Sequence, residues 1–167
     1  MNNRKSNHFV KFLFLLYLLL LVWIILFKLS FSLSELDRIR EINIIQFYYE
    51  HEVTFHATEV VENVLIFIPF GVYLCMLKKP SKFAAKLLVI AGTSAVFEML
   101  QFILAVGRTD ITDLITNTCG GVLGILLYNG IIKVAPNEER INKIITVAAA
   151  IVTFIVGGGL IFLILVN

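Results

Sequence analysis

Charged residues are scarce in this chain of 167 residues, because only 16% are Asp, Glu, Lys or Arg while 59% are hydrophobic. A soluble domain has about 25% charged residues and roughly 45–50% apolar ones. An apolar excess of this size cannot be enclosed in one water-soluble core of this length, so much of it must face lipid. The composition therefore excludes a soluble globular domain and predicts an integral membrane protein.

The chain also has few cysteines and no cluster of basic residues, and these two shortages argue against other classes of protein. Cys75 and Cys119 are the only cysteines, and they lie inside apolar runs with no CxxC spacing and no histidine beside them. This argues against a disulfide framework or a zinc knuckle. The 14 basic residues are scattered between apolar runs, and the net charge is only +2. Because no basic patch is formed, we expect no nucleic-acid partner.

Long apolar runs predict an all-α, polytopic membrane helix bundle with about five transmembrane helices. The expected spans are 9–28, 59–77, 83–106, 110–132 and 144–166, and each is close to the roughly 20 residues that cross ~30 Å of hydrocarbon. The first run is longer than the h-region of a signal peptide, so we expect an uncleaved helix. Because the later connections are short, residues 1–167 are predicted to form a single membrane domain with antiparallel neighbours.

The distribution of basic residues predicts that the N-terminus is cytoplasmic. When the five crossings are counted, ten lysines and arginines share the side of the N-terminus and four lie on the other side. Lysine and arginine are enriched in cytoplasmic loops. The long connection 30–58 and the tight turn 107–109 then share the outer face. Parts of the long connection, such as Ile42 and Phe47, are expected to lie on the membrane surface.

The few polar side chains inside the predicted helices are grouped toward this outer face. A charge at the centre of a spanning helix costs roughly 2.5–3.5 kcal/mol, so such groups usually face the interior and carry function. Glu98 and Gln101 share one helix face, and Asp110, Asp113 and Asn117 share another. The span 59–77 adds Asn63, and the turn 107–109 adds Arg108. The candidate site therefore consists of Asn63, Glu98, Gln101, Arg108, Asp110, Asp113 and Asn117.

Arg108 is the natural counter-charge for these carboxylates, because its planar fork pairs with them in a bidentate way. A purely structural salt bridge between Arg108 and Glu98 is one interpretation. One arginine against Glu98, Asp110 and Asp113 nevertheless leaves an acidic excess. We therefore expect that at least one carboxyl is protonated, or holds a cation or a proton from a ligand.

Structural roles remain open for several of these residues. Asp110 and Asp113 have the spacing of a capping box at the start of a helix. Asn63 and Gln101 fit interhelical hydrogen bonds. These interpretations compete with a binding role for the same side chains.

Metal and serine chemistry are both weakly indicated. A metal set is conceivable from His56, Glu59, Glu98 and Asp113, but no HExxH motif or paired-histidine spacing is present. We therefore expect neither a metal nor another cofactor. Ser94 lies one helical turn before Glu98, but no GxSxG motif or membrane-placed histidine accompanies it.

Glycine and proline point to the packing of the helices. Gly120 and Gly124 form a GxxxG motif, which lets two helix backbones approach closely. The three glycines at 157–159 either form the surface that packs against Gly120 and Gly124, or make their own helix locally flexible. Pro69 removes one backbone hydrogen bond from its helix and is expected to kink it near Ile66.

Three blocks of the sequence resemble the signature of the VanZ-like membrane family. ENVLIFIPFG at residues 62–71 is similar to its N-x-x-x-F-x-P-x-G segment, and FEMLQF at 97–102 is similar to its E-x-x-Q helix. GRTDITDLITNTCGG at 107–121 is similar to its Arg–Asp–Asp–Asn block. REINIIQF at 40–47 looks like a degraded R-x-x-N-L-x-P-F segment, with Gln46 where proline is usual. The resemblance covers about residues 40–130.

The resemblance implies a multi-pass protein of the bacterial cell membrane, in a family associated with low-level resistance to the glycopeptide teicoplanin. Its polar positions map onto the seven candidate site residues. The expected function is envelope protection, in which an outer-leaflet polar pocket binds an amphipathic or lipid-linked molecule. The expected partners are membrane lipids and such a small molecule. One alternative is an intramembrane enzyme that acts on a lipid or cell-wall lipid intermediate with Glu98 as acid or base. Another is a structural partner subunit.

Overall fold

The computed structural model describes residues 2–27, 42–43, 57–77, 81–106, 109–134 and 137–166. In these ranges the long helices are α1 (Asn2–Phe27), α2 (Ala57–Leu77), α3 (Phe83–Leu104), α4 (Ile111–Val134) and α5 (Glu138–Val166). Two two-residue strands, β1 (Ile42–Asn43) and β2 (Thr109–Asp110), pair in parallel. All five helices are long and apolar enough to cross a membrane. The predicted all-α bundle of five spanning helices is confirmed.

Local polar groups set helix ends that the apolar runs did not mark. Helix α5 begins at Glu138 rather than near residue 144, because the side chain of Asn137 accepts the Arg140 N–H at 3.1 Å and caps the first turn. Helix α3 ends at Leu104 rather than 106, since Ala105 adopts the left-handed conformation with φ 53°. Both ends depend on hydrogen bonds that a hydropathy pattern does not contain.

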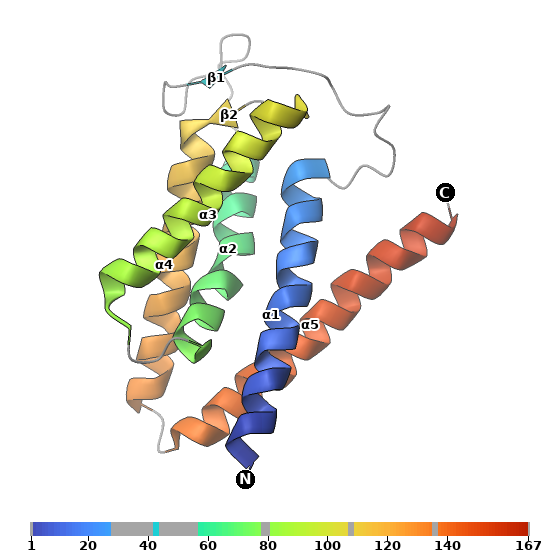
Figure 1. Cartoon of the computed structure of the whole chain (residues 1–167). Coiled ribbons are helices and arrows are strands. Elements are labelled where there is room, and N and C mark those ends of the chain that lie inside the picture. The colour runs from blue at the N-terminus through green and yellow to red at the C-terminus, as the bar shows by residue number, and fades with distance from the viewer. Residues whose placement is uncertain are drawn as a thin grey trace.

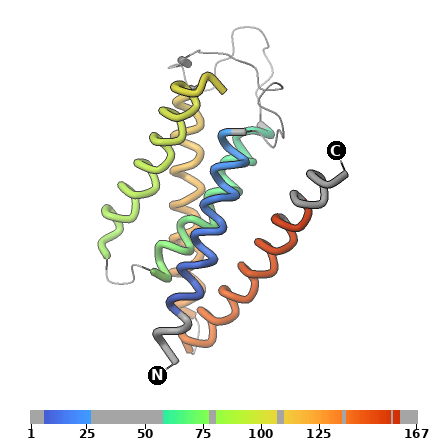
Figure 2. The backbone as a smooth tube through the Cα atoms, turned by 45° about the vertical axis from the view of Figure 1, so that its right-hand side comes forward, coloured from blue at the N-terminus to red at the C-terminus, as the bar shows by residue number. Residues whose placement is uncertain are grey.

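Helices α1 to α4 form a bundle, whereas α5 touches α1 near its start and then diverges (Figures 1 and 2). Each helix leaves large apolar side chains on the outside, such as Leu15, Leu65, Leu88, Leu126 and Phe154. In water such exposure would drive aggregation, but in a bilayer these side chains meet lipid. The exposed apolar surface therefore agrees with a membrane-embedded bundle.

Helices α2 and α4 pack with their backbones in contact. A Cβ added at Gly120 would collide with the carbonyl oxygen of Val64, and one added at Gly124 with that of Ile68. On the facing side, a Cβ at Gly71 would collide with the carbonyl oxygen of Gly121. The close approach predicted from the GxxxG motif is confirmed, and α2 is the partner.

Helix α5 does not supply the matching smooth surface. A Cβ at any of Gly157–Gly159 would meet no heavy atom of the described residues within 4 Å. The interpretation of these glycines as the partner of Gly120 and Gly124 is therefore wrong. Because glycine carries no side chain that marks its partner, spacing alone did not distinguish α5 from α2.

Helix α2 continues through Pro69 with support from α1. A proline inside a helix removes the hydrogen bond to the carbonyl oxygen four residues earlier, here that of Leu65. In the same turn, the Tyr17 hydroxyl donates to the carbonyl oxygen of Ile66 at 2.6 Å. Phe14 lies beside Tyr73 and Phe70, with ring centroids 5.3 and 5.6 Å apart respectively. An aromatic contact with one polar anchor therefore joins α1 to α2.

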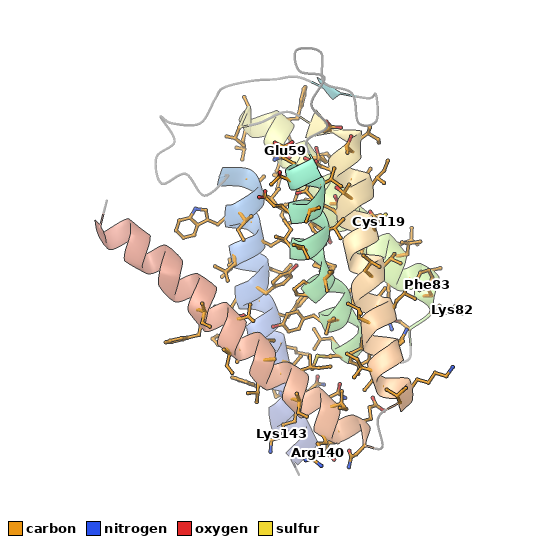
Figure 3. The ribbon with its side chains drawn as sticks, turned by 180° about the vertical axis from the view of Figure 1, so that it is seen from behind. Glu59, Lys82, Phe83, Cys119, Arg140 and Lys143 are labelled. Carbon is orange, nitrogen blue, oxygen red and sulfur yellow. The ribbon has the colours of Figure 1, made fainter. Side chains whose placement is uncertain are left out.

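The two ends of the bundle differ in charge. Figure 3 shows Glu59 at one end and Arg140 and Lys143 at the other. We call the first, where α1 ends and α2 and α4 begin, the site end, and the other the basic end. The basic side chains that the structure describes belong to segments at the basic end: Lys11, Lys82, Lys86, Lys133, Arg140 and Lys143. This asymmetry is the one on which the predicted cytoplasmic N-terminus rests.

Candidate functional site

The first turn of α4 is held by two carboxylates. Asp110 precedes the helix, and its Oδ1 accepts the backbone N–H of Thr112 at 2.8 Å. The predicted capping role of Asp110 is therefore confirmed. In a capping box the N–H of Asp110 would donate to the side chain three residues on. Here it donates to Oε2 of Glu98 on α3 at 2.9 Å. Glu98 and Asp110 are both buried.

This contact explains how a carboxylate is accommodated in the third helix. Glu98 lies before the end of α3, but α4 begins only a short connection later and runs back beside α3 (Figure 1). The Glu98 side chain thus reaches a backbone N–H at the positive end of the α4 dipole, which stabilises negative charge. The sequence did not identify this partner, because Asp110 contributes its backbone rather than its side chain.

Asp113 joins α4 to α2. Its Oδ1 accepts a hydrogen bond from Nδ2 of Asn63 at 2.8 Å. Asn63 is half-buried, whereas Glu59 and Glu62 on the same helix are exposed. The interhelical hydrogen bond suggested for Asn63 is confirmed.

Asn117 joins α4 to α3 one turn further from the site end. Its Nδ2 donates to the Ser94 hydroxyl at 3.0 Å, and the two side chains are only 2% and 0% exposed. Ser94 therefore acts as a hydrogen-bond partner in the site, a role that sequence reasoning missed. Its position one turn before Glu98 was the available signal. Within the described residues, the Asn117 Oδ1 has no hydrogen-bond partner.

Gln101 joins α3 to α1. Its Nε2 donates to the carbonyl oxygen of Ile25 at 3.1 Å. Ile25 lies in the last turn of α1, where carbonyl groups have no partner inside the helix. The interhelical role suggested for Gln101 is confirmed. The side chain is 4% exposed, and among the described residues nothing donates to its Oε1.

Side chains from three helices thus meet at the site end, and a backbone carbonyl of a fourth joins them. We call this group the polar cluster; it consists of Asn63, Ser94, Glu98, Gln101, Asp110, Asp113 and Asn117. Asp113 and Asp110 both lie within electrostatic reach of Glu98. The cluster is therefore acidic, and six of the seven predicted site residues belong to it.

The remaining predicted site residue, Arg108, lies outside the described residues, as does His56. The salt bridge suggested between Arg108 and Glu98 therefore stays a prediction. Most of the connection 30–58 also lies outside the described residues. Within the described ranges, no three histidine, cysteine, aspartate or glutamate side chains gather closely enough to hold a metal ion.

Strand β1, which lies within the long connection 30–58, pairs with β2 just before α4. The backbone of Ile42 lies opposite Thr109, and that of Asn43 lies opposite Asp110. The backbone pairing places Ile42 beside the α3–α4 connection, and its expected location on the membrane surface stays a prediction. Phe47 lies outside the described residues. Asn43 was not chosen as a site residue, although the R-x-x-N resemblance pointed to it.

Comparison with known proteins adds a decisive observation, since residues 14–133 match the model of the VanZ/LLP1 family. The chain belongs to the VanZ/LLP1 family. Protein VanZ of Enterococcus faecium is 39% identical over 132 residues, which cover 78% of this chain and 79% of that protein. No solved structure matches the chain significantly.

The matched range is wider than the resemblance found in the sequence, because it reaches back to residue 14. It includes the second half of α1, all of α2 and α3, nearly all of α4 and the whole polar cluster. Helix α5 begins after it. The part shared with the VanZ/LLP1 family is therefore the four-helix bundle that builds the cluster.

Proposed function

We propose that this chain is a multi-pass protein of the bacterial cell membrane that protects the envelope against lipoglycopeptides, with low-level resistance of the teicoplanin type. In this proposal the polar cluster binds the head of an amphipathic or lipid-linked molecule at the outer leaflet. Membership in the VanZ/LLP1 family and the relation to Protein VanZ support the envelope role.

The observation that carries the binding proposal is the burial of polar groups in the cluster. Glu98, Gln101, Asp110 and Asn117 are each less than 10% exposed. Burying so many polar groups inside a membrane bundle is costly and is typical of a functional site. Hydrophobic contacts or glycine packing would hold α3 against α4 at lower cost, so stability alone does not account for the arrangement.

The surface beside the cluster suits the tail of such a molecule. On the outside of the last turns of α3, Met99 is 63% and Ile103 is 64% exposed, and Phe102 is also exposed. These side chains lie on the same helix as Glu98 and Gln101. An acyl tail can therefore pack along the lipid-facing side of α3 while its head reaches the buried polar groups.

The test compares Glu98→Gln with Glu62→Gln in cells that depend on the chain for reduced teicoplanin sensitivity. Both changes remove one carboxylate near the site end, but Glu62 is exposed and outside the cluster. We expect Glu98→Gln to restore full sensitivity at unchanged protein level, while Glu62→Gln behaves as wild type. If Glu98→Leu stabilises the protein in detergent and leaves sensitivity unchanged, the cluster is structural and the proposal fails.

An intramembrane enzyme is the second candidate, and one observation favours it. Glu98 is buried within electrostatic reach of Asp110 and Asp113, and an environment of this kind suits a general acid or base. The substrate would be a lipid or a cell-wall lipid intermediate. Mass spectrometry of lipid extracts tests it: a lipid altered by the wild-type chain but not by Glu98→Gln selects the enzyme.

A further inference from the structure

The basic end of the bundle contains a buried lysine that contacts a sulfur atom. Lys86 lies in the first turn of α3, and its side chain is only 7% exposed. Its Nζ donates a hydrogen bond to Sγ of Cys75, which lies near the end of α2, at 3.4 Å. Cys75 is 2% exposed. Among the described residues, this sulfur is the one acceptor that contacts the Lys86 amine.

Support of the fold is a weak explanation for this contact. A lysine near the end of a spanning helix usually extends toward water or pairs with a carboxylate, and Lys82, one turn earlier, is exposed. A thiol is only a weak hydrogen-bond acceptor, so it compensates poorly for the burial of an amine. A nucleophilic nitrogen and an oxidisable sulfur are instead held within reach of each other.

The surroundings of the pair enclose it. Tyr128 on α4 lies within electrostatic reach of Cys75 and is itself 5% exposed. Its hydroxyl donates to Oδ1 of Asn142 on α5 at 2.7 Å, so groups from four helices lie at this end. Burial of this kind excludes bulky reagents, whereas hydrogen peroxide is small and uncharged. Peroxide is therefore the class of oxidant that suits the pair.

We propose that Cys75 and Lys86 form a covalent cross-link, a sulfenamide bond between Sγ and Nζ, when hydrogen peroxide oxidises the cysteine. A sulfenic acid condenses with a nearby nitrogen, and the 3.4 Å contact places the Lys86 nitrogen beside the sulfur. The pair lies at the other end of the bundle from the polar cluster, so this inference does not depend on the proposed function.

The reaction uses one peroxide for each link and releases two waters. In the first step the sulfur attacks a peroxide oxygen and the O–O bond breaks. The Lys86 amine takes the thiol proton and passes it to the departing hydroxide, so the sulfur loses two electrons and becomes a sulfenic acid. In the second step the amine attacks the sulfur and the S–O bond breaks. The hydroxide leaves with one amine proton as water.

The cross-link would join two helices that have few direct contacts with each other. Helix α2 packs mainly against α4, and the chain passes from α2 to α3 at the basic end. A bond from Cys75 to Lys86 would therefore fix the start of α3 to the end of α2. Because both helices continue to the polar cluster, the link would restrict their relative movement.

Peptide mapping of the full chain in phosphatidylcholine nanodiscs tests the proposal. The protein is treated with hydrogen peroxide at a concentration that oxidises the exposed Cys119, and is then digested without reductant. Trypsin cleaves after Lys82, between the two residues of the pair, so a link keeps their peptides joined and blocks cleavage after Lys86. We expect joined peptides whose mass is two hydrogens below the sum of their parts, and their separation by dithiothreitol.

Variants assign the link to the pair. Lys86→Arg keeps the positive charge, but the guanidinium stays protonated and is not a nucleophile, so the joined peptides should disappear and Cys75 should take up oxygen instead. Cys75→Ser should also abolish the link. Lys82→Arg is the matched control, because the residue is exposed and trypsin still cleaves after it, and it should cross-link as wild type. Circular dichroism and size-exclusion chromatography identify a variant that does not fold, and the wild-type mapping does not depend on any variant.

Three results would overturn the inference. In the first, Cys75 stays reduced while Cys119 in the same sample is oxidised. In the second, Cys75 gains oxygen while trypsin still cleaves after Lys86, which shows that the amine does not capture the sulfur. In the third, the joined peptides lose two hydrogens but gain one oxygen, which assigns an oxygen-bridged link in place of the direct bond.

Discussion

Helix α4 uses two different ways of packing in successive turns. Its first two turns are tied to neighbouring helices by polar side chains, through Asp113 to Asn63 and through Asn117 to Ser94. In the following turns, Gly120 and Gly124 let the backbone of α4 touch that of α2. One helix thus has a polar half at the site end and a smooth half further along.

The two halves of α4 differ in what they contribute: the smooth half holds the bundle together, and the polar half supplies the candidate functional groups. Lipid is as apolar as a helix face, so helices in a membrane associate through close packing and interhelical hydrogen bonds. The glycines of the smooth half give close packing with α2 without placing a polar side chain at that contact. The polar half buries carboxylates and amides in the same bundle, and it is the half that we expect to be functional.

The smooth half should give the largest loss of stability. In Gly124→Val the new Cβ collides with the Ile68 carbonyl, whereas in Gly130→Val on the same helix it meets no described heavy atom within 4 Å. We expect Gly124→Val to lower the free energy of unfolding by about 3 kcal/mol, or to prevent accumulation of folded protein. Thermal unfolding in detergent measures this, and equal behaviour of the two variants would contradict it.

The polar half should give a smaller effect on stability. Asn63→Ala, Asp113→Ala and the double variant form a thermodynamic cycle for the 2.8 Å contact between α2 and α4. We expect a coupling energy of about 1 kcal/mol, which is typical of hydrogen bonds between membrane helices. Unfolding of the four proteins in the same detergent provides it. Purely additive single effects would show that the contact contributes nothing to stability.

The smallest effect on stability is expected at Cys119, which lies between the two halves of α4 in the sequence. Cys119 is exposed, and Figure 3 shows it on the outer side of that helix. Because its thiol takes no part in either mode of packing, Cys119→Ala should change stability by less than about 0.5 kcal/mol. The same thermal measurement checks this, and a loss comparable to that of Gly124→Val would overturn the division of α4 into two inner contacts.

The sequence predicted the side chains of the polar cluster better than the groups that they contact. Grouping by helix face selected Glu98, Gln101, Asp113 and Asn117, because each is polar within an apolar run. It did not select the Ile25 carbonyl or the Asp110 N–H, since every residue carries these backbone groups and no pattern marks the ones that are used. Gly71 was likewise missed as the partner of the GxxxG motif, because one glycine in an apolar helix is not a distinctive signal.

By itself, the sequence determined that the chain crosses the membrane in five helices and that its polar residues gather toward one end. Both follow from local properties, namely the length of an apolar run and the position of a charge within it. Only the tertiary structure decided that α2 rather than α5 faces the glycines of α4, and that Glu98 meets the start of α4. The physical reason is that lipid-facing and helix-facing surfaces are both apolar, so the rotation of each helix about its axis is set by contacts between segments distant in the chain.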